Sequence, residues 1–343
     1  MLVVMMTAWP VFEGVLLAAV RALGISLVRH PAAGLAILLL ATTVAGGEEV
    51  PSSAAIHAKR IHVARPISPA LPFDGVATPS PEDLKSRPGE HPLMPAIRWA
   101  RQRLESLRLI RDYSCTFVKR ERVDGELGEH EFVRMKVRNE PFSVYLYYLR
   151  PQDKRGQEVL YVDGRNEGKL WAHSNGMRDR VMGTVSLEPQ GPFAMRGNRY
   201  PLTEIGMVNL VERLIGVAEA DAKYGECEVR TYSGAKINGR RCLCLEVEHP
   251  RPRQNFRFHI ARIYIDHQLN LPVRYESYTW PRIPGGKPML IEEYTYLNVR
   301  LNHGYDDTDF DTRNPEYDFP REVLSTDEVA HPRQSHLIMR GFR

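Results

Sequence analysis

The residues that could carry acid–base or metal chemistry are scattered along this sequence and do not form a known motif. The chain contains no G-x-S-x-G, H-E-x-x-H, Walker or G-x-G-x-x-G pattern, and these are common signatures of hydrolases, zinc proteases and nucleotide-binding proteins. His249, His259 and His267 would have to be brought together by the fold before they could hold a metal ion. We therefore predict a non-catalytic protein with no metal ion and no cofactor.

Four cysteines offer redox chemistry instead. Cys115, Cys227, Cys242 and Cys244 are even in number, so two disulfide bonds are possible in an oxidising compartment, with three connectivities left open. Cys242 and Cys244 would share one face of a strand and so could not easily bond to each other. Free, buried thiols are the alternative.

The charge balance favours no charged partner. The net charge is +4, from 46 basic and 42 acidic residues. Bases and acids interleave in the run Lys119–Arg122 (KRER), which is typical of a solvated strand edge. A nucleic-acid-binding protein usually concentrates basic residues on one face, so we predict no nucleic-acid partner.

The N-terminal part of the chain predicts export. An uncharged run from Ala32 to Ala45 follows Arg29 and His30. It has the length of the apolar core of a signal peptide and is short for a membrane span. We expect cleavage near Gly46 and a periplasmic or secreted protein, with an inner-membrane anchor over residues 1–45 as the alternative. Residues 46–92 contain eight prolines and are predicted to form a disordered linker.

Periodicity predicts one α+β domain over residues 93–320, followed by a tail over 321–343. Apolar residues three and four apart predict a helix over Met94–Leu109 and a second helix over Leu202–Val217, capped by Thr203. Asn238-Gly239 predicts a tight turn between two antiparallel strands. Strands are expected over Tyr113–Val123, Glu131–Arg138, Phe142–Leu149, Glu158–Val162, Lys169–His173, Cys227–Tyr232, Arg241–Glu248, Phe256–Ile265, Val273–Thr279 and Leu290–Val299.

Aromatic residues fall on predicted strands on both sides of the second helix. Such residues either fill an ordinary core or line an apolar cavity between the sheet and that helix, and the sequence leaves both readings open. The candidates for a cavity wall are Phe117, Phe132, Trp171, Phe256, Phe258, Tyr275 and Tyr294.

The segments RDYSCTFVKRERV, PFSVYLYYL and RYPLTEIGMVNLVERLI resemble the domain of unknown function 1571 family. The order of elements also resembles the outer-membrane lipoprotein carrier superfamily. This resemblance implies an open antiparallel β half-barrel with an N-terminal helix and a helical lid. It further implies that the cavity binds a lipid or a lipidated protein.

The carrier family has an arginine that helps to hold its lid closed, just before the proline that opens the aromatic strand. The matching residue here is Arg138, although Asn139 and Glu140 separate it from Pro141.

The alternative function is a sensor or interaction module of the same fold that binds an envelope protein.

Overall fold

The computed structural model describes residues 78–174 and 183–320. The predicted export segment, most of the predicted linker and the C-terminal tail lie outside these residues. Within the described part, no helix is long and apolar enough to cross a membrane. The last part of the predicted linker belongs to the fold, because Leu84 is only 5% exposed and packs with Ala96, Leu243 and Ile265. The packed chain thus begins earlier than its proline content predicts.

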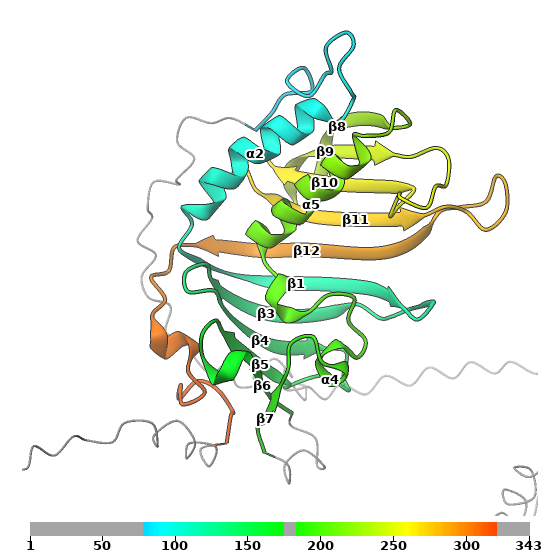
Figure 1. The fold of residues 1–343 in the computed structure, drawn as a ribbon. Helices are drawn as coiled ribbons and strands as arrows, with labels where there is room; N and C mark the ends of the chain where they lie inside the picture. Colours follow the sequence, from blue (N-terminus) through cyan, green and yellow to red (C-terminus); the bar gives the residue numbers. More distant parts are fainter. Residues whose placement is uncertain (1–77, 175–182, 321–343) are drawn as a thin grey trace, which may run out of the picture. The chain divides into compact units, whose positions relative to one another are not determined.

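One antiparallel sheet of 12 strands forms the framework (Figure 1). The strand order is β7-β6-β5-β4-β3-β1-β12-β11-β10-β9-β8, and β2 pairs with β1. Because β7 and β8 end this order in the described residues and do not pair with each other, the sheet is open, which confirms the predicted half-barrel. The strands are β1 Asp112–Val123, β2 Glu126–Leu127, β3 Glu131–Arg138, β4 Ser143–Arg150, β5 Glu158–Val162, β6 Leu170–His173, β7 Val185–Leu187, β8 Glu228–Ile237, β9 Arg240–Glu248, β10 Ile260–Asp266, β11 Pro272–Thr279 and β12 Met289–Leu301.

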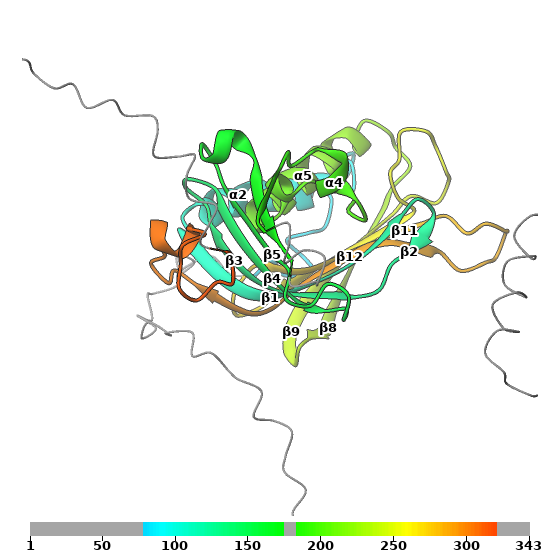
Figure 2. The ribbon, with the colours of Figure 1, turned by 90° about the horizontal axis from the view of Figure 1, so that it is seen from below.

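The helices lie on one side of this sheet (Figure 2). They are α2 Met94–Arg108, the short α4 Pro192–Met195 and α5 Met207–Asp221. The chain also forms the 3-10 turns η1 Asn166–Gly168, η2 Leu202–Glu204 and η3 Asp307–Phe310, and η3 belongs to the C-terminal segment on the other face of the sheet. The predicted first helix is confirmed, and α2 and α5 pack against each other. The helices therefore leave the opposite face of the sheet to other parts of the chain.

The second helix begins later than the sequence predicts. Residues 202–204 form η2, and Gly206 then has φ 110°, a conformation that interrupts a helix and favours glycine. The N–H of Met207 donates to the Tyr113 hydroxyl at 3.0 Å, so a tyrosine of β1 takes the place of a capping residue. Thr203 does not cap the helix, and α5 continues to Asp221.

The predicted turn at Asn238-Gly239 is confirmed, with positive φ at both residues and Ile237 paired with Arg240. The strand predicted over Phe256–Ile265 is shorter, since β10 starts at Ile260. Its neighbour β9, which pairs with β10 from Glu248, ends at that residue just before Pro250, and proline cannot donate to a strand ladder. Phe256 and Phe258 therefore lie in an irregular segment.

The face of the sheet away from the helices carries a second core. Phe310, Tyr317 and Phe319 from the C-terminal segment pack with residues of β4 and β5. Tyr317 stacks on Tyr145 of β4, with ring centroids 3.8 Å apart. The C-terminal segment is therefore a structural cover for this face.

Candidate functional site

A cavity of about 810 Å³ lies between the sheet and the segment that runs from α4 through η2 to α5. This volume is in the range that holds one small-molecule ligand. Its apolar walls come from β1, β3, β4, β5, β6 and α5. The apolar lining includes Phe117, Val133, Leu146, Val159, Leu170, Leu210, Leu214 and Val217.

Four of the predicted aromatic residues line this cavity. Phe117, Tyr275 and Tyr294 come from β1, β11 and β12, and β12 lies between the other two strands. Tyr294 stacks on both, with ring centroids 5.9 Å from Phe117 and 6.3 Å from Tyr275. Phe258 lines the cavity from the irregular segment before β10. The structure thus brings these residues together from parts of the chain that are far apart in sequence.

Three other predicted aromatic residues do not line the cavity. Side chains alternate between the faces of a strand, and Phe132 and Trp171 point away from the faces that their lining neighbours Val133 and Leu170 present. Trp171 packs on the C-terminal segment core instead. Phe256 stacks on His249, with ring centroids 4.0 Å apart.

Arg138 does not hold the helical lid. It lies at the end of β3, and its guanidinium donates to Asp307 at 2.8 Å and to Ser143 at 3.0 Å. The same group lies over the Phe310 ring, 5.0 Å from its centroid. Because Arg138 faces the C-terminal segment, its role is to anchor that segment, and the gating role implied by the resemblance is wrong.

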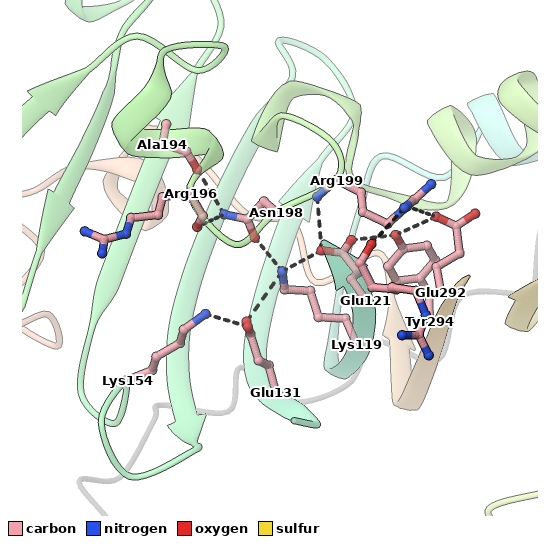
Figure 3. A network of polar contacts seen from close by, with 11 residues as sticks. Lys119, Glu121, Glu131, Lys154, Ala194, Arg196, Asn198, Arg199, Glu292 and Tyr294 are labelled. Carbon is pink, nitrogen blue, oxygen red and sulfur yellow. Dashed lines mark hydrogen bonds and ion pairs between the residues drawn. The ribbon is translucent and has the colours of Figure 1, made fainter. Parts of the chain in front are cut away.

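A cluster of charged residues occupies one wall of the cavity (Figure 3). Its centre is Lys119, 9% exposed, which donates to Glu121 at 3.3 Å and to Asn198 at 2.5 Å and lies 3.5 Å from Glu131. Lys154 pairs with Glu131 at 2.5 Å. Sequence reasoning placed Lys119 and Glu121 at a solvated strand edge, which is wrong because β1 lies in the middle of the sheet. We call this group, with Arg199, Glu292 and Tyr294, the Lys119 cluster.

Arg199 attaches the segment between α4 and η2 to the sheet through this cluster. Its backbone N–H donates to Glu121 at 3.2 Å and its Nε to Glu292 at 3.0 Å, while Nη1 donates to the carbonyl of Arg122 at 2.9 Å. The Tyr294 hydroxyl donates to Glu121 at 2.5 Å. The position of the Lys119 and Glu121 side chains could have been predicted from their spacing. They are two and four residues after Phe117, so they lie on the same face of β1 as Phe117.

Burial sets the protonation of the cluster. Burial raises the pKa of the Tyr294 hydroxyl far above its usual range, and the carboxylates of Glu292 and Glu121 raise it further. Burial acts to lower the pKa of Lys119, but Glu121 and other nearby acidic groups raise it above its ordinary value. Tyr294 therefore stays a neutral donor and Lys119 a cation at neutral pH, which suits this wall to polar atoms rather than to hydrocarbon.

The four cysteines are free and buried, and none of them forms a disulfide within the described residues. In the strand registers, Cys115 is opposite Met135, Cys242 opposite Asp266, and Cys244 opposite Tyr264, so no two thiols face each other there. Burial raises the pKa of Cys227 to about 12 and those of Cys242 and Cys244 to about 11. The predicted disulfides are therefore replaced by unreactive thiols. The described residues also hold no group of three or more metal-ligating side chains.

Comparisons with known proteins add a family and a distant structural likeness. The profile of the family described as "Protein of unknown function (DUF1571)" matches residues 110–319. Among solved structures the chain is similar to lipoprotein LppX of Mycobacterium tuberculosis, with 14% identity and a TM-score of 0.35 over 62% of this chain and 98% of that chain. A LolA superfamily protein of Nitrosomonas europaea gives 15% identity and a TM-score of 0.25 over 62% and 97% of the two chains.

A DUF1329 family protein of Desulfovibrio piger gives 12% identity and a TM-score of 0.33, over 63% of this chain and 96% of that chain. The chain shows no significant similarity to any curated protein. The likeness to these solved structures is too low to assign a function, and the cavity is the feature that bears on it.

Proposed function

The chain belongs to the family of proteins of unknown function DUF1571, as its sequence motifs predicted, and we propose that its cavity binds the acyl chain of a lipid or of a lipidated protein. One observation supports this proposal above all others. The cavity of about 810 Å³ has apolar walls on both sides, from the sheet and from α5. These apolar walls match a flexible hydrocarbon chain, and the Lys119 cluster on one wall would face the polar end of the ligand.

Burial of the acyl chain in the cavity would supply the binding free energy. Each methylene removed from water contributes about 0.8 kcal/mol, and part of this gain is offset by the loss of motion on binding. The apolar side chains of Leu146, Leu210 and Leu214 would contact the acyl chain, together with Phe117, which stacks on Tyr294. No proton transfer or nucleophile is needed, so the proposed function is binding without catalysis.

The predicted export segment supports a location of this binding in the cell envelope. Lipids and lipidated proteins have to cross the aqueous periplasm there, and an apolar cavity would shield their chains from water. We therefore propose a periplasmic or secreted protein, with an anchored form as the alternative.

A fluorescent fatty acid titrated into the full chain tests the proposal. Leu214→Trp places a larger side chain in the cavity and should weaken binding by at least roughly tenfold, because the added volume displaces ligand. The matched control is Ala220→Trp, on an exposed position of the same helix that does not line the cavity. Equal affinity in both variants, or no binding by the wild type, would contradict the proposal.

Binding of an envelope protein is the second candidate function. It is favoured by β8, a strand of ten residues that pairs on one side only within the described sheet. This edge also carries features that discourage unspecific pairing with other strands, since Arg230 and Lys236 are exposed and a bulge lies between Ser233 and Ala235. Recovery of one stoichiometric protein partner and no lipid from the native envelope would favour this function over lipid binding.

A further inference from the structure

One rim of the cavity exposes an aromatic side chain. Phe193 on α4 lines the cavity and is 78% exposed to solvent. Among the described residues, the other large hydrophobic or aromatic side chains with high exposure do not line the cavity; these are Leu109, Tyr224, Tyr232 and Ile283. Phe193 therefore marks a place where the apolar interior reaches the surface. We call residues 189–199, which include α4, the lip.

The lip carries basic charge without acidic charge. The charged residues of the lip are Arg196 and Arg199; the acidic residues nearest to it in sequence are Glu188 and Glu204, and Glu204 pairs with Arg213. Arg199 is bound to Glu121 and Glu292, whereas the Arg196 side chain is exposed and points away from the Lys119 cluster (Figure 3). Phe193 and Arg196 are therefore close in sequence on the lip, and both side chains are exposed to solvent.

This combination matches the surface of an anionic membrane. Aromatic side chains are stabilised at the interface between headgroups and acyl chains. Anionic lipids attract arginine and lysine side chains close to the surface. A water-exposed Phe193 loses its contact with water in such an interface, and Arg196 gains lipid phosphates as partners.

The lip is also firmly placed relative to the cavity. The Asn198 side chain donates to the carbonyl of Ala194 at 2.9 Å and accepts from Lys119 at 2.5 Å. Because this asparagine links α4 to β1, a membrane that contacts α4 lies directly beside the cavity opening. An acyl chain could then leave the bilayer without crossing water.

We propose that the lip docks the cavity onto an anionic membrane surface, with Phe193 inserted among the lipid headgroups and Arg196 paired with lipid phosphates. The acyl chain then passes between the bilayer and the cavity at this rim. The inference rests on the proposed function, since it specifies where and from what source the cavity is loaded. A partner protein that delivers the lipid is the competing occupant of the lip.

The test measures how fast a pyrene-labelled fatty acid moves from vesicles to the full chain. Two kinds of donor vesicle are used, phosphatidylcholine alone and phosphatidylcholine mixed equally with phosphatidylglycerol. The variants are Phe193→Ser and Arg196→Gln. Ile283→Ser is the matched control, because Ile283 is 68% exposed on the connection between β11 and β12 and does not line the cavity. The N-terminal segment is the same in every protein compared, so differences between variants report on the lip.

We expect the wild type to load faster from the anionic vesicles. Arg196→Gln should reduce the ratio of anionic to neutral rates by roughly fivefold. A change in the cavity itself would affect both rates of one variant and so would cancel in this ratio. Phe193→Ser should slow loading from both vesicles by roughly tenfold relative to Ile283→Ser, a larger loss than it causes in the binding of free fatty acid, because Phe193 also lines the cavity.

Two results would overturn the inference. One is an unchanged ratio in Arg196→Gln, and the other is a Phe193→Ser rate equal to that of the Ile283→Ser control. Binding of the same fatty acid without vesicles is measured in parallel. If the wild type binds free fatty acid but neither variant changes loading from vesicles, only the docking surface is refuted. If the wild type binds no free fatty acid, the proposed function fails first.

Discussion

Asp221, the last residue of α5, offers a quantitative test of how the helix over the cavity is held. Its side chain is 2% exposed, and its Oδ2 lies 3.4 Å from Nε2 of the fully buried His249. Nδ1 of the His249 ring faces the carbonyl oxygen of Phe258 at 3.3 Å. A carbonyl only accepts, so Nδ1 carries the proton in the neutral ring. Nε2 and the Asp221 carboxylate are then two acceptors that face each other, without a hydrogen-bond partner on either atom.

Burial raises the pKa of Asp221 from 3.8 to about 6, against an opposing effect of Arg257. Because the folded-state pKa is raised, the stabilising contribution is complete below the unfolded value and is lost as the pH rises through about 6. At about 1.4 kcal/mol for each pH unit, ionised Asp221 costs about 3 kcal/mol near pH 8. Asp221→Asn removes this cost, and its amide can donate to Nε2 of His249.

We therefore expect Asp221→Asn to stabilise the protein by about 2–3 kcal/mol near pH 8, with the gain disappearing towards about pH 4. Burial lowers the pKa of His249. This effect is present in the wild type and in Asp221→Asn, so it largely cancels in the difference between their free energies of unfolding. Other groups whose charges act on the pair are His91, His259 and Cys227, and Arg103 of α2 lines a small pocket together with Asp221.

The measurement is urea denaturation of the wild type and variant at several pH values. Glu219→Gln is the matched control on α5, because Glu219 pairs with Arg101 at an exposed position and such pairs contribute about 0–1 kcal/mol. Destabilisation by Asp221→Asn near pH 8 would contradict this expectation, since it would indicate a favourable ion pair between Asp221 and a protonated His249. A gain that stays constant down to about pH 4 would refute it as well.

Three further predictions concern the cavity, the Lys119 cluster and the thiols. Phe258→Glu places a carboxylate on the cavity wall where water can reach it, so the protein should stay folded and lose affinity for fatty acid; unfolding in a thermal melt would instead indicate a dry wall. Arg199→Ala removes the side-chain partner of the buried Glu292, whereas the backbone N–H that donates to Glu121 remains; the variant should destabilise the protein by about 2 kcal/mol in urea denaturation, and no change would show that the side-chain attachment is dispensable. A thiol reagent near pH 8 should modify no cysteine before unfolding, because burial raises the pKa of Cys227 to about 12; rapid labelling of the native protein would contradict this.

The strands were predictable because their side chains follow local rules. β3 and β5 have the predicted bounds, and the turn at Asn238-Gly239 forms because both residues accept positive φ. Errors occurred where a distant part of the chain decides the structure. The Tyr113 hydroxyl binds the N–H of Met207, and this contact across 94 residues could not be read from the sequence around Thr203.

The site was predictable only in part. The aromatic residues of the predicted strands included Phe117 and Tyr294, which line the cavity. Composition does not say which face of a strand a residue occupies, and on β3 it is Val133, next to Phe132, that lines the cavity. Lys119 looked solvated because its neighbours in sequence are charged. It is buried because Asn198, which is 79 residues away, packs over it. A buried ion-pair cluster of this kind depends on the tertiary fold and leaves no local pattern.

Native mass spectrometry of the protein, after gentle extraction from its own envelope, shows directly whether the cavity holds a lipid. If the cavity beneath α5 binds an acyl chain, the folded protein will carry an added mass that matches a lipid or lipidated protein. The added mass should be lost on denaturation and be strongly reduced in Leu214→Trp but not in Ala220→Trp. Wild-type protein that is folded and free of any lipid-containing ligand, under conditions that preserve such a ligand on a known lipid-binding protein, would contradict the account.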